Sequence, residues 1–265
     1  MNNQIVLGLL SEAGGVGKTT IAVNLAYEWS CRDRSAVILD LDSNHSLEDF
    51  VGLGDDCEAD ETIVKVFSKD FQGDWPLQTP PEFPEKFQVC QGHSLLNEIE
   101  QNLVSKKRRE YILCKLLKDY PLSSELVILD CNAGWDLISY NVLAASTHLL
   151  IPLDMGVKVK TAARLIETIL LTASELELDP MPEIIGLIPN RYNKGASVHE
   201  EFLKQLPEVA ESVGIKLYPA IRTWQYLNNS AVFGLPLKRM RAADPLVKIF
   251  SAIANDLEKV QDAQT

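Results

Sequence analysis

The chain has 265 residues, of which 46% are hydrophobic and 23% are charged, and its formal net charge at pH 7 is −12. A chain of this length and composition can bury a full α/β core, and we expect one domain over residues 1–265. The acidity excludes a protein that binds nucleic acid over its whole surface, because nonspecific binding needs Lys and Arg side chains to replace the counterions on phosphates.

The first residues, MNNQIVLGLL, have no basic region ahead of their apolar run, and no apolar run in the chain approaches the ~18 residues of a membrane span. We therefore expect a cytoplasmic protein. The five cysteines are scattered, without a CxxC pair, which favours reduced structural thiols and argues against a zinc site.

Short apolar runs and helical patterns alternate along the chain. The runs predict buried parallel strands at residues 4–10, 36–41, 87–90, 126–131, 148–153, 184–189 and 215–219. Apolar residues at three- and four-residue spacing predict helices at residues 19–30, 105–119, 160–176, 198–213 and 246–260. The predicted fold is therefore α/β, a doubly wound and mostly parallel sheet flanked by helices, which binds ligands at the carboxyl ends of its strands.

The first predicted strand leads into SEAGGVGKTT, residues 11–20, which ends in the Gly-Lys-Thr of a phosphate-binding loop. Glycines let backbone N–H groups turn toward phosphate oxygens, the lysine can neutralise the β and γ phosphates, and the next threonine can ligate Mg²⁺. The order strand, loop, helix argues against a glycine-rich turn formed by chance. We expect ATP and Mg²⁺ to bind at Gly14, Gly15, Val16, Gly17, Lys18, Thr19 and Thr20.

Residues 43–86 form the least regular part of the chain. They include an acidic run at residues 48–61 and the segment TPPEFPEKF. Because prolines and clustered charge disfavour regular elements, we expect a surface excursion near the nucleotide face.

Several motifs, in this order, resemble the ParA/MinD family of ATPases, which have a variant Walker A loop. GGVGKTT and the following IAVNLA resemble that loop and its helix, VILDLD at 37–42 the second acidic motif, and LVILD at 126–130 the Walker B strand. IIGLIPNRYN at 184–193 resembles the strand and loop that hold adenine, and PAIRTWQYLNNSAVFGLPL at 219–237 the C-terminal segment. The resemblance covers most of the chain and implies a P-loop NTPase fold and slow ATP hydrolysis to ADP and phosphate.

The resemblance assigns three catalytic residues. Lys18 contacts the phosphates, Asp40 orients the attacking water, and Asp130 holds the Mg²⁺ shell through water. Asp130 also follows from its position, since a charge at the end of a buried apolar strand is costly without a partner. Asp42 takes part in the chemistry or caps the following loop.

The resemblance also assigns the adenine site. Asn190 is the candidate for the edge of the base, since a side-chain amide both donates and accepts, and Arg191 would stack or pair nearby. The alternative is that Asn190 only forms the turn after its strand.

The chain departs from the family at two places. Ala13 stands where the family has a lysine that reaches the partner's phosphates in an ATP sandwich dimer, and Cys131, Asn132 and Ala133 replace a common proline pair. The carboxysome-positioning (McdA-like) branch resembles this chain in lacking that lysine and uses one from its C-terminal half. Lys158 and Lys160, expected at the carboxyl end of a strand, are our candidates, and the alternative is that both face solvent.

The family resemblance implies a switch: an ATP-dependent homodimer binds a surface, and an adaptor protein stimulates hydrolysis. The end of this chain, DLEKVQDAQT, is acidic and polar, unlike the basic amphipathic helix of the MinD branch, so we expect no membrane contact. Residues 220–250 carry five basic residues against one acidic residue, a patch suited to nonspecific DNA and nucleoid association. The five are Arg222, Lys238, Arg239, Arg241 and Lys248.

A second basic run, KKRR at 106–109, is a weaker DNA candidate, because an isolated charge run usually faces solvent. Three other functions remain open. They are an ATP-binding scaffold that hydrolyses negligibly because of Ala13, a biosynthetic P-loop ligase, and a nitrogenase-type reductase, which the scattered cysteines disfavour.

Overall fold

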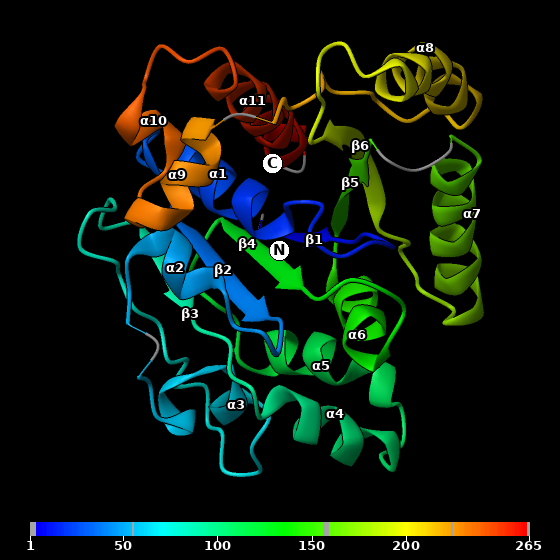
Figure 1. Cartoon of the computed structure of the whole chain (residues 1–265). Coiled ribbons are helices and arrows are strands. Elements are labelled where there is room, and N and C mark those ends of the chain that lie inside the picture. The colour runs from blue at the N-terminus through cyan, green and yellow to red at the C-terminus, as the bar shows by residue number, and fades with distance from the viewer. Residues whose placement is uncertain (1–3, 55, 156–158, 224, 264–265) are drawn as a thin grey trace.

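The computed structural model describes residues 4–54, 56–155, 159–223 and 225–263. Its centre is a six-stranded sheet in the order β3-β2-β4-β1-β5-β6, and every neighbouring pair is parallel (Figure 1). The strands are β1 (Ile5–Leu9), β2 (Ala36–Leu41), β3 (Phe87–Cys90), β4 (Leu126–Cys131), β5 (His148–Asp154) and β6 (Glu183–Asn190).

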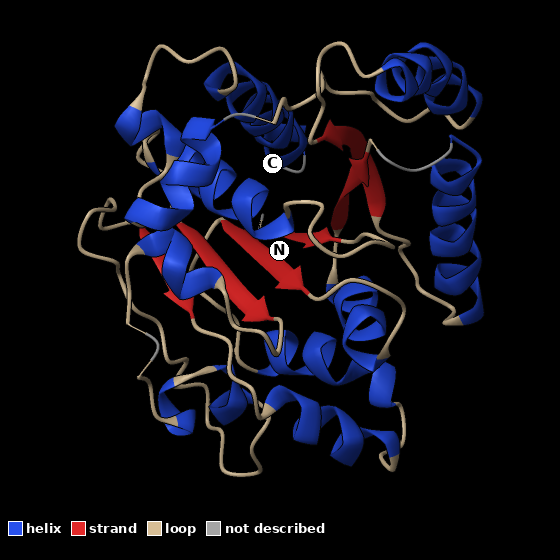
Figure 2. Ribbon diagram, viewed as in Figure 1, coloured by secondary structure: helices blue, strands red, loops and turns tan. Residues whose placement is uncertain are grey.

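Helices cover both faces of this sheet (Figure 2). Alternate side chains of β1 enter different cores: Ile5, Leu7 and Leu9 belong to one buried cluster and Val6 to the other. The first cluster is covered by α1 (Lys18–Ser30), α2 (Leu47–Val51), α9 (Gln225–Phe233), α10 (Leu237–Met240) and α11 (Val247–Ala263). The second is covered by α3 (Ile63–Val66), α4 (Leu96–Val104), α5 (Ile112–Asp119), α6 (Leu137–Ala145), α7 (Val159–Glu175) and α8 (Ser197–Ser212). The predicted doubly wound α/β fold is thereby confirmed.

The prediction of a strand at residues 215–219 is wrong, since this segment meets β6 only through an isolated bridge between Leu187 and Leu217. The ring of Tyr218 covers Gly186, where a Cβ atom would lie 2.3 Å from the ring. Pro219, the next residue, has no N–H to continue the ladder. The segment therefore runs beside the sheet without extending it.

The single helix predicted at 105–119 is also wrong in its first half. The chain forms α4 earlier, turns through 105–108, and continues as the 3-10 helix η2 (Arg109–Tyr111) into α5. Arg108 has a φ of 52°, in the left-handed region, which ends any regular helix there. The four consecutive basic residues at 106–109 carry no sequence signal for this turn.

Residues 43–86 hold only short elements: α2, the 3-10 helix η1 (Ala59–Glu61), α3, and one antiparallel bridge that joins Gln78 to Val89 of β3. No helix within the described ranges is long and apolar enough to cross a lipid bilayer.

The strand register decides which side chains meet at the carboxyl edge of the sheet. Leu9, the last residue of β1, lies opposite Asp130 of β4, and Asp130 lies opposite Asp40 of β2. The glycine-rich loop that follows β1 therefore starts beside two carboxylates from neighbouring strands.

Candidate nucleotide-binding site

The glycine-rich loop connects β1 to the N-terminus of α1. Gly17, the residue before this helix, has a φ of 89°, and a Cβ atom there would lie 2.3 Å from the amide nitrogen of Asn190. Both facts require glycine at this position. The loop thus leads backbone N–H groups into the start of a helix, the arrangement that binds phosphate oxygens elsewhere.

Lys18 is 7% exposed, unusual burial for a lysine. Its ammonium donates a hydrogen bond to the Ser11 hydroxyl at 2.9 Å, and that hydroxyl donates to the Ala13 carbonyl at 3.1 Å. The lysine is therefore folded back over the loop. Ser11 was missed by sequence reasoning, since a serine ahead of the glycines carries no signal of its own.

Asp40 and Asp130 are each 1% exposed. Asp40 accepts the Asp42 N–H at 3.0 Å with one oxygen. Its other oxygen and both oxygens of Asp130 are buried without a hydrogen-bond partner of ordinary geometry among the described residues. Such groups are rare in folded proteins and call for an unseen partner.

The charges at this edge shift both carboxyl groups. Burial, and then the charge of Asp130, raise the pKa of Asp40 well above its usual range. Burial raises the pKa of Asp130 to about 6, while the Thr19 hydroxyl and the Lys18 ammonium act in the opposite direction. Both shifts arise mainly from burial, which disfavours the charged form of a carboxyl group.

These orphaned oxygens fit a magnesium nucleotide. Asp130, with Thr19 beside it, would hold the ion's water shell, and the ion would neutralise charge on the phosphates. The described residues contain no cluster of three or more His, Cys, Asp or Glu side chains suited to a metal ion.

Asp42 has a local partner. One of its carboxylate oxygens accepts both the N–H and the side-chain amide of Asn44 at 2.9 Å. This geometry corresponds to the loop-capping alternative.

Asn190 and Arg191 lie against the glycine-rich loop, at the end of β6. The Asn190 amide donates to the Val16 carbonyl at 2.6 Å and accepts the Arg191 N–H at 2.8 Å. The Arg191 guanidinium donates to the Gly15 carbonyl at 3.2 Å. Both side chains brace the loop here, and their predicted contact with adenine stays a prediction.

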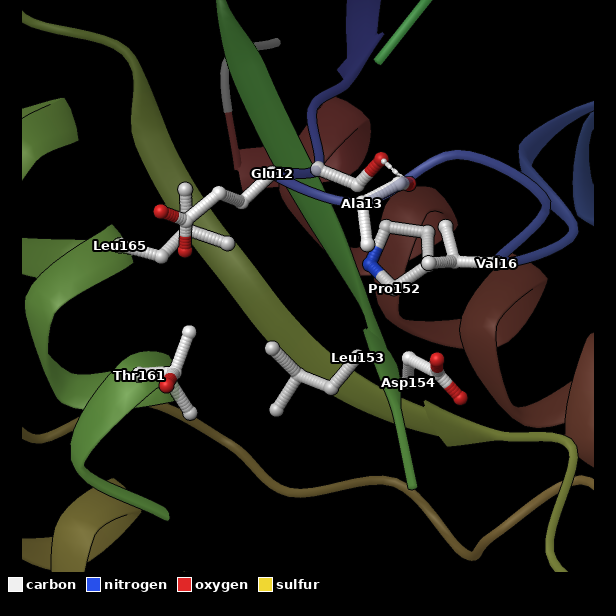
Figure 3. A pocket seen from close by; sticks show the side chains of 10 residues that line it. Glu12, Ala13, Val16, Pro152, Leu153, Asp154, Thr161 and Leu165 are labelled. Carbon is white, nitrogen blue, oxygen red and sulfur yellow. Dashed lines mark hydrogen bonds between the residues drawn. The ribbon is translucent and has the colours of Figure 1, made fainter. Parts of the chain in front are cut away.

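Ala13 borders a cavity of about 170 Å³ between the loop, the end of β5 and α7 (Figure 3). Apolar side chains form most of its wall, and Glu12, Asp154 and Thr161 contribute polar atoms. Lys160, next to Thr161, is exposed in the first turn of α7. Lys158, the other candidate for the missing lysine, lies outside the described residues.

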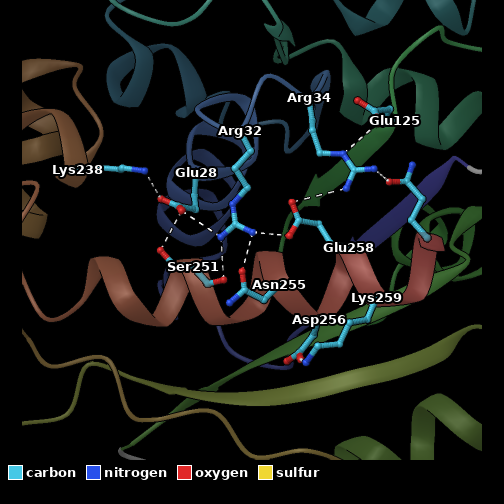
Figure 4. Close-up of polar contacts among 11 residues, drawn as sticks. Glu28, Arg32, Arg34, Glu125, Lys238, Ser251, Asn255, Asp256, Glu258 and Lys259 are labelled. Carbon is cyan, nitrogen blue, oxygen red and sulfur yellow. Dashed lines mark hydrogen bonds and ion pairs between the residues drawn. The ribbon is translucent and has the colours of Figure 1, made fainter. Parts of the chain in front are cut away.

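The predicted DNA-binding residues divide into groups. The Lys238 ammonium donates to the buried Glu28 at 2.8 Å, within a network that joins α1 to α10 and α11 (Figure 4). Arg239 pairs with Glu82 at 3.0 Å, and both side chains are exposed. Arg222 and Lys248 instead line one cavity of about 410 Å³, and Arg241 is exposed in the turn after α10. The first three residues of the KKRR run lie in the turn before η2 with exposed side chains, and the fourth, Arg109, begins η2.

Comparison with known proteins adds to this geometry. A family model described as an AAA domain matches residues 5–179. The chromosome partitioning protein ParA of Myxococcus xanthus is 28% identical over 222 residues, which cover 80% of this chain and 76% of that protein.

Three solved structures share the fold. Apo McdA of Cyanothece has a TM-score of 0.80 at 19% identity, covering 97% of this chain and 99% of that one. An ATP complex of the same protein, with an aspartate replaced by alanine, has a TM-score of 0.79 at 20% identity, covering 100% and 97%. MinD of Pyrococcus horikoshii, complexed with Mg-ADP, has a TM-score of 0.72 at 17% identity and covers 99% of each chain.

Proposed function

Since this chain belongs to the AAA domain family, and within it to the ParA and MinD group of P-loop ATPases, we propose that it binds ATP with Mg²⁺ and hydrolyses the nucleotide slowly. The observation that carries the proposal is the set of unpartnered carboxylate oxygens on Asp40 and Asp130 beside the buried Lys18. ATP in the McdA variant and Mg-ADP in MinD support both ligands.

Each residue has a part in this reaction. The loop amides and Lys18 bind and orient the phosphates, Thr19 and Asp130 would hold the Mg²⁺ with its water, and Asp40 orients the attacking water. Bound Mg²⁺ supplies charge neutralisation on the phosphates. Positioning of this kind is most of what phosphoryl transfer requires from a protein.

We further propose that ATP closes two copies of the chain into a sandwich dimer. The cavity beside Ala13 has room for a longer side chain, and the first turn of α7, which carries Lys160, lies next to it. A basic residue from this region of the second subunit would restore the charge that Ala13 lacks.

The dimer would bind nonspecific DNA through the basic segment 220–250 and position or partition a cargo with an adaptor protein that stimulates hydrolysis. The local excess of positive charge in an acidic chain supports DNA as the surface. Similar ATPases move plasmids, chromosomes and carboxysomes, and the nucleoid would be the site of the ATP-bound form. We propose a cytoplasmic location for the released monomer.

Single-turnover hydrolysis of ATP, with and without DNA, tests the proposal. We expect phosphate release from the wild type and none above background from Lys18→Ala, while Lys118→Ala, a control on the exposed side of α5, matches the wild type. No release by the wild type, together with tight ATP binding, would favour the scaffold alternative.

Sedimentation with MgATP tests the dimer. We expect Lys158→Ala or Lys160→Ala to shift the protein toward monomer, since the missing charge would leave the phosphates unneutralised across the interface. A double variant that dimerises like the wild type would reject both lysines.

A further inference from the structure

Glu48 is a buried acidic residue that the proposed reaction does not use. It lies on α2, directly after the loop that carries Asp42, and its side chain is 5% exposed. One carboxylate oxygen, Oε1, lies 2.5 Å from Nδ1 of His45. The other, Oε2, is buried with no hydrogen-bond partner among the described residues.

His45 connects this carboxylate to the neighbouring loop. Its φ of 37° lies in the left-handed region, which a non-glycine residue adopts only when its surroundings hold it there. Its N–H donates to the Asp42 carbonyl at 3.0 Å, and its ring stacks on His93 with centroids 6.2 Å apart. Glu48 thus fixes a strained loop through its Oε1 atom.

The loop that carries His93 also borders Asp40. A Cβ atom on Gly92 would lie 2.8 Å from Oδ2 of Asp40 and equally close to the Asp42 carbonyl. Glu48 is also near enough for its charge to contribute to the raised pKa of Asp40. Asp40 therefore borders the segment of Gly92 and His93 directly, and Glu48 is connected to the same segment through His45.

Both orphaned atoms, Oε2 of Glu48 and Oδ2 of Asp40, are acceptors. Two carboxylate acceptors cannot satisfy each other, whereas a water molecule, a donor with two hydrogens, can satisfy two acceptors. Burying a carboxylate oxygen without a donor is costly, which favours a water molecule beside Oε2.

We propose that Glu48 is a positioning residue for ATP hydrolysis: Oε1 anchors the β2–α2 loop through His45, and Oε2 accepts a hydrogen bond from a water that also donates to Asp40. This inference rests on the proposed ATPase function, in which Asp40 orients the attacking water. Glu48 acts on that water through Asp40 and the loop, without touching the nucleotide.

Two substitutions separate the roles of the two oxygens. Glu48→Gln keeps an oxygen for His45 and replaces the free acceptor with an amide donor, whereas Glu48→Ala removes both. We expect kcat to fall about tenfold in Glu48→Gln and further in Glu48→Ala, with KM for ATP unchanged. Asp49→Asn, which neutralises the next, exposed residue of α2, is the matched control and should keep the wild-type kcat.

A role limited to structure predicts a different result. In that case Glu48→Gln, which retains the contact with His45, would keep the wild-type kcat, and this outcome overturns the proposal. We expect the free energy of unfolding of Glu48→Gln to stay within about 1 kcal/mol of the wild-type value, because the contact with His45 is retained and only the hydrogen bond to the water changes. A loss of stability that accounts for the lost activity would likewise count against it.

A crystal structure of the nucleotide-free protein keeps the two hypotheses distinct. If the wild type hydrolyses no ATP, the proposed function fails, and the water can still be sought directly. We expect an ordered water within hydrogen-bond distance of Glu48 Oε2 and Asp40 Oδ2. Well-ordered density in which either oxygen bonds only protein donors would overturn the inference.

Discussion

The two ends of helix α1 use buried charge in opposite ways. At its start, Lys18 lies near Asp130, and three of the four carboxylate oxygens of Asp40 and Asp130 are buried without a partner among the described residues. Near its end, Glu28 is buried to a similar degree but accepts hydrogen bonds from Lys238 at 2.8 Å, Ser251 at 2.9 Å and Arg32 at 3.2 Å. The carboxylate of Glu28 has protein partners that join α1 to α10 and α11, whereas the oxygens at the start of the helix have none among the described residues.

The pKa shifts express the same contrast. Burial raises the pKa of Asp130 to about 6. Burial also acts to raise the pKa of Glu28, but the hydrogen bonds from Lys238, Ser251 and Arg32 outweigh it, and the pKa is lowered. The sign therefore depends on the partners, since desolvation acts at both ends.

The largest expected effect is on ATP hydrolysis, from a substitution of Asp40 near the start of α1. Asp40→Ala should lower single-turnover hydrolysis by at least about 100-fold, because the attacking water loses the group that orients it. ATP affinity should persist, since Asp40 is not among the residues proposed to bind the nucleotide. Asp60→Asn, an exposed acidic residue of η1, is the control. Hydrolysis within a factor of three of the wild type would contradict the role of Asp40.

Near the end of α1, a substitution of Glu28 should lower the stability of the fold. Glu28→Ala leaves the cations of Lys238 and Arg32 without their shared carboxylate, and we expect the free energy of unfolding to fall by about 3 kcal/mol. Urea denaturation measures this loss, and ATP affinity measured by calorimetry should stay unchanged. A variant of wild-type stability would show that the network contributes no net stabilisation.

The stability that Glu28 contributes should depend on pH. A carboxyl group whose pKa is lowered by folding stabilises the fold above its ordinary value of 4.5, and this stabilisation is lost as pH falls through the lower, folded value. Glu28→Gln should therefore be less stable than the wild type by about 2 kcal/mol at pH 7. The difference should shrink toward zero in acid. Parallel stability curves between pH 3 and pH 7 would contradict this assignment.

Sequence reasoning identified Lys18, Asp40 and Asp130 at the start of α1. It missed the hydrogen-bond network around Glu28 near the end of that helix. Asp40 and Asp130 lie near the ends of buried apolar strands and Lys18 follows a glycine loop, and a parallel sheet brings such positions to one edge. All six strands of the sheet were predicted to within one residue at each end, because apolar runs mark buried parallel strands.

The rest depended on long-range contacts. Glu28 and Lys238 are 210 residues apart, and nothing in either local sequence signals their pairing. Glu48 belongs to an acidic run that we predicted to lie at the surface, and the fold instead buries it. The turn at Arg108 depends on a left-handed backbone conformation, and a run of basic residues gives no signal of such a conformation.

The smallest expected effects concern the basic segment, where the same contrast between partnered and unpartnered charge applies. Lys238 serves Glu28, whereas Arg222 and Lys248 line a cavity at the surface. A double variant, Arg222→Ala with Lys248→Ala, should weaken DNA binding and lower the salt slope of log affinity by about two, one for each lost phosphate contact. Its unfolding free energy should stay within about 0.5 kcal/mol of the wild type.

Lys238→Ala should show the opposite pattern, a loss of stability without a change in DNA binding. Its ammonium is held by a buried carboxylate, so releasing it should cost about 1 kcal/mol of stability while leaving the salt slope of DNA binding unchanged. Fluorescence anisotropy with a DNA duplex at several salt concentrations gives the slope, and urea denaturation gives the stability. If the two variants lower the slope equally, the ion pair opens when DNA binds, and partnered charge in this segment is available to ligands after all.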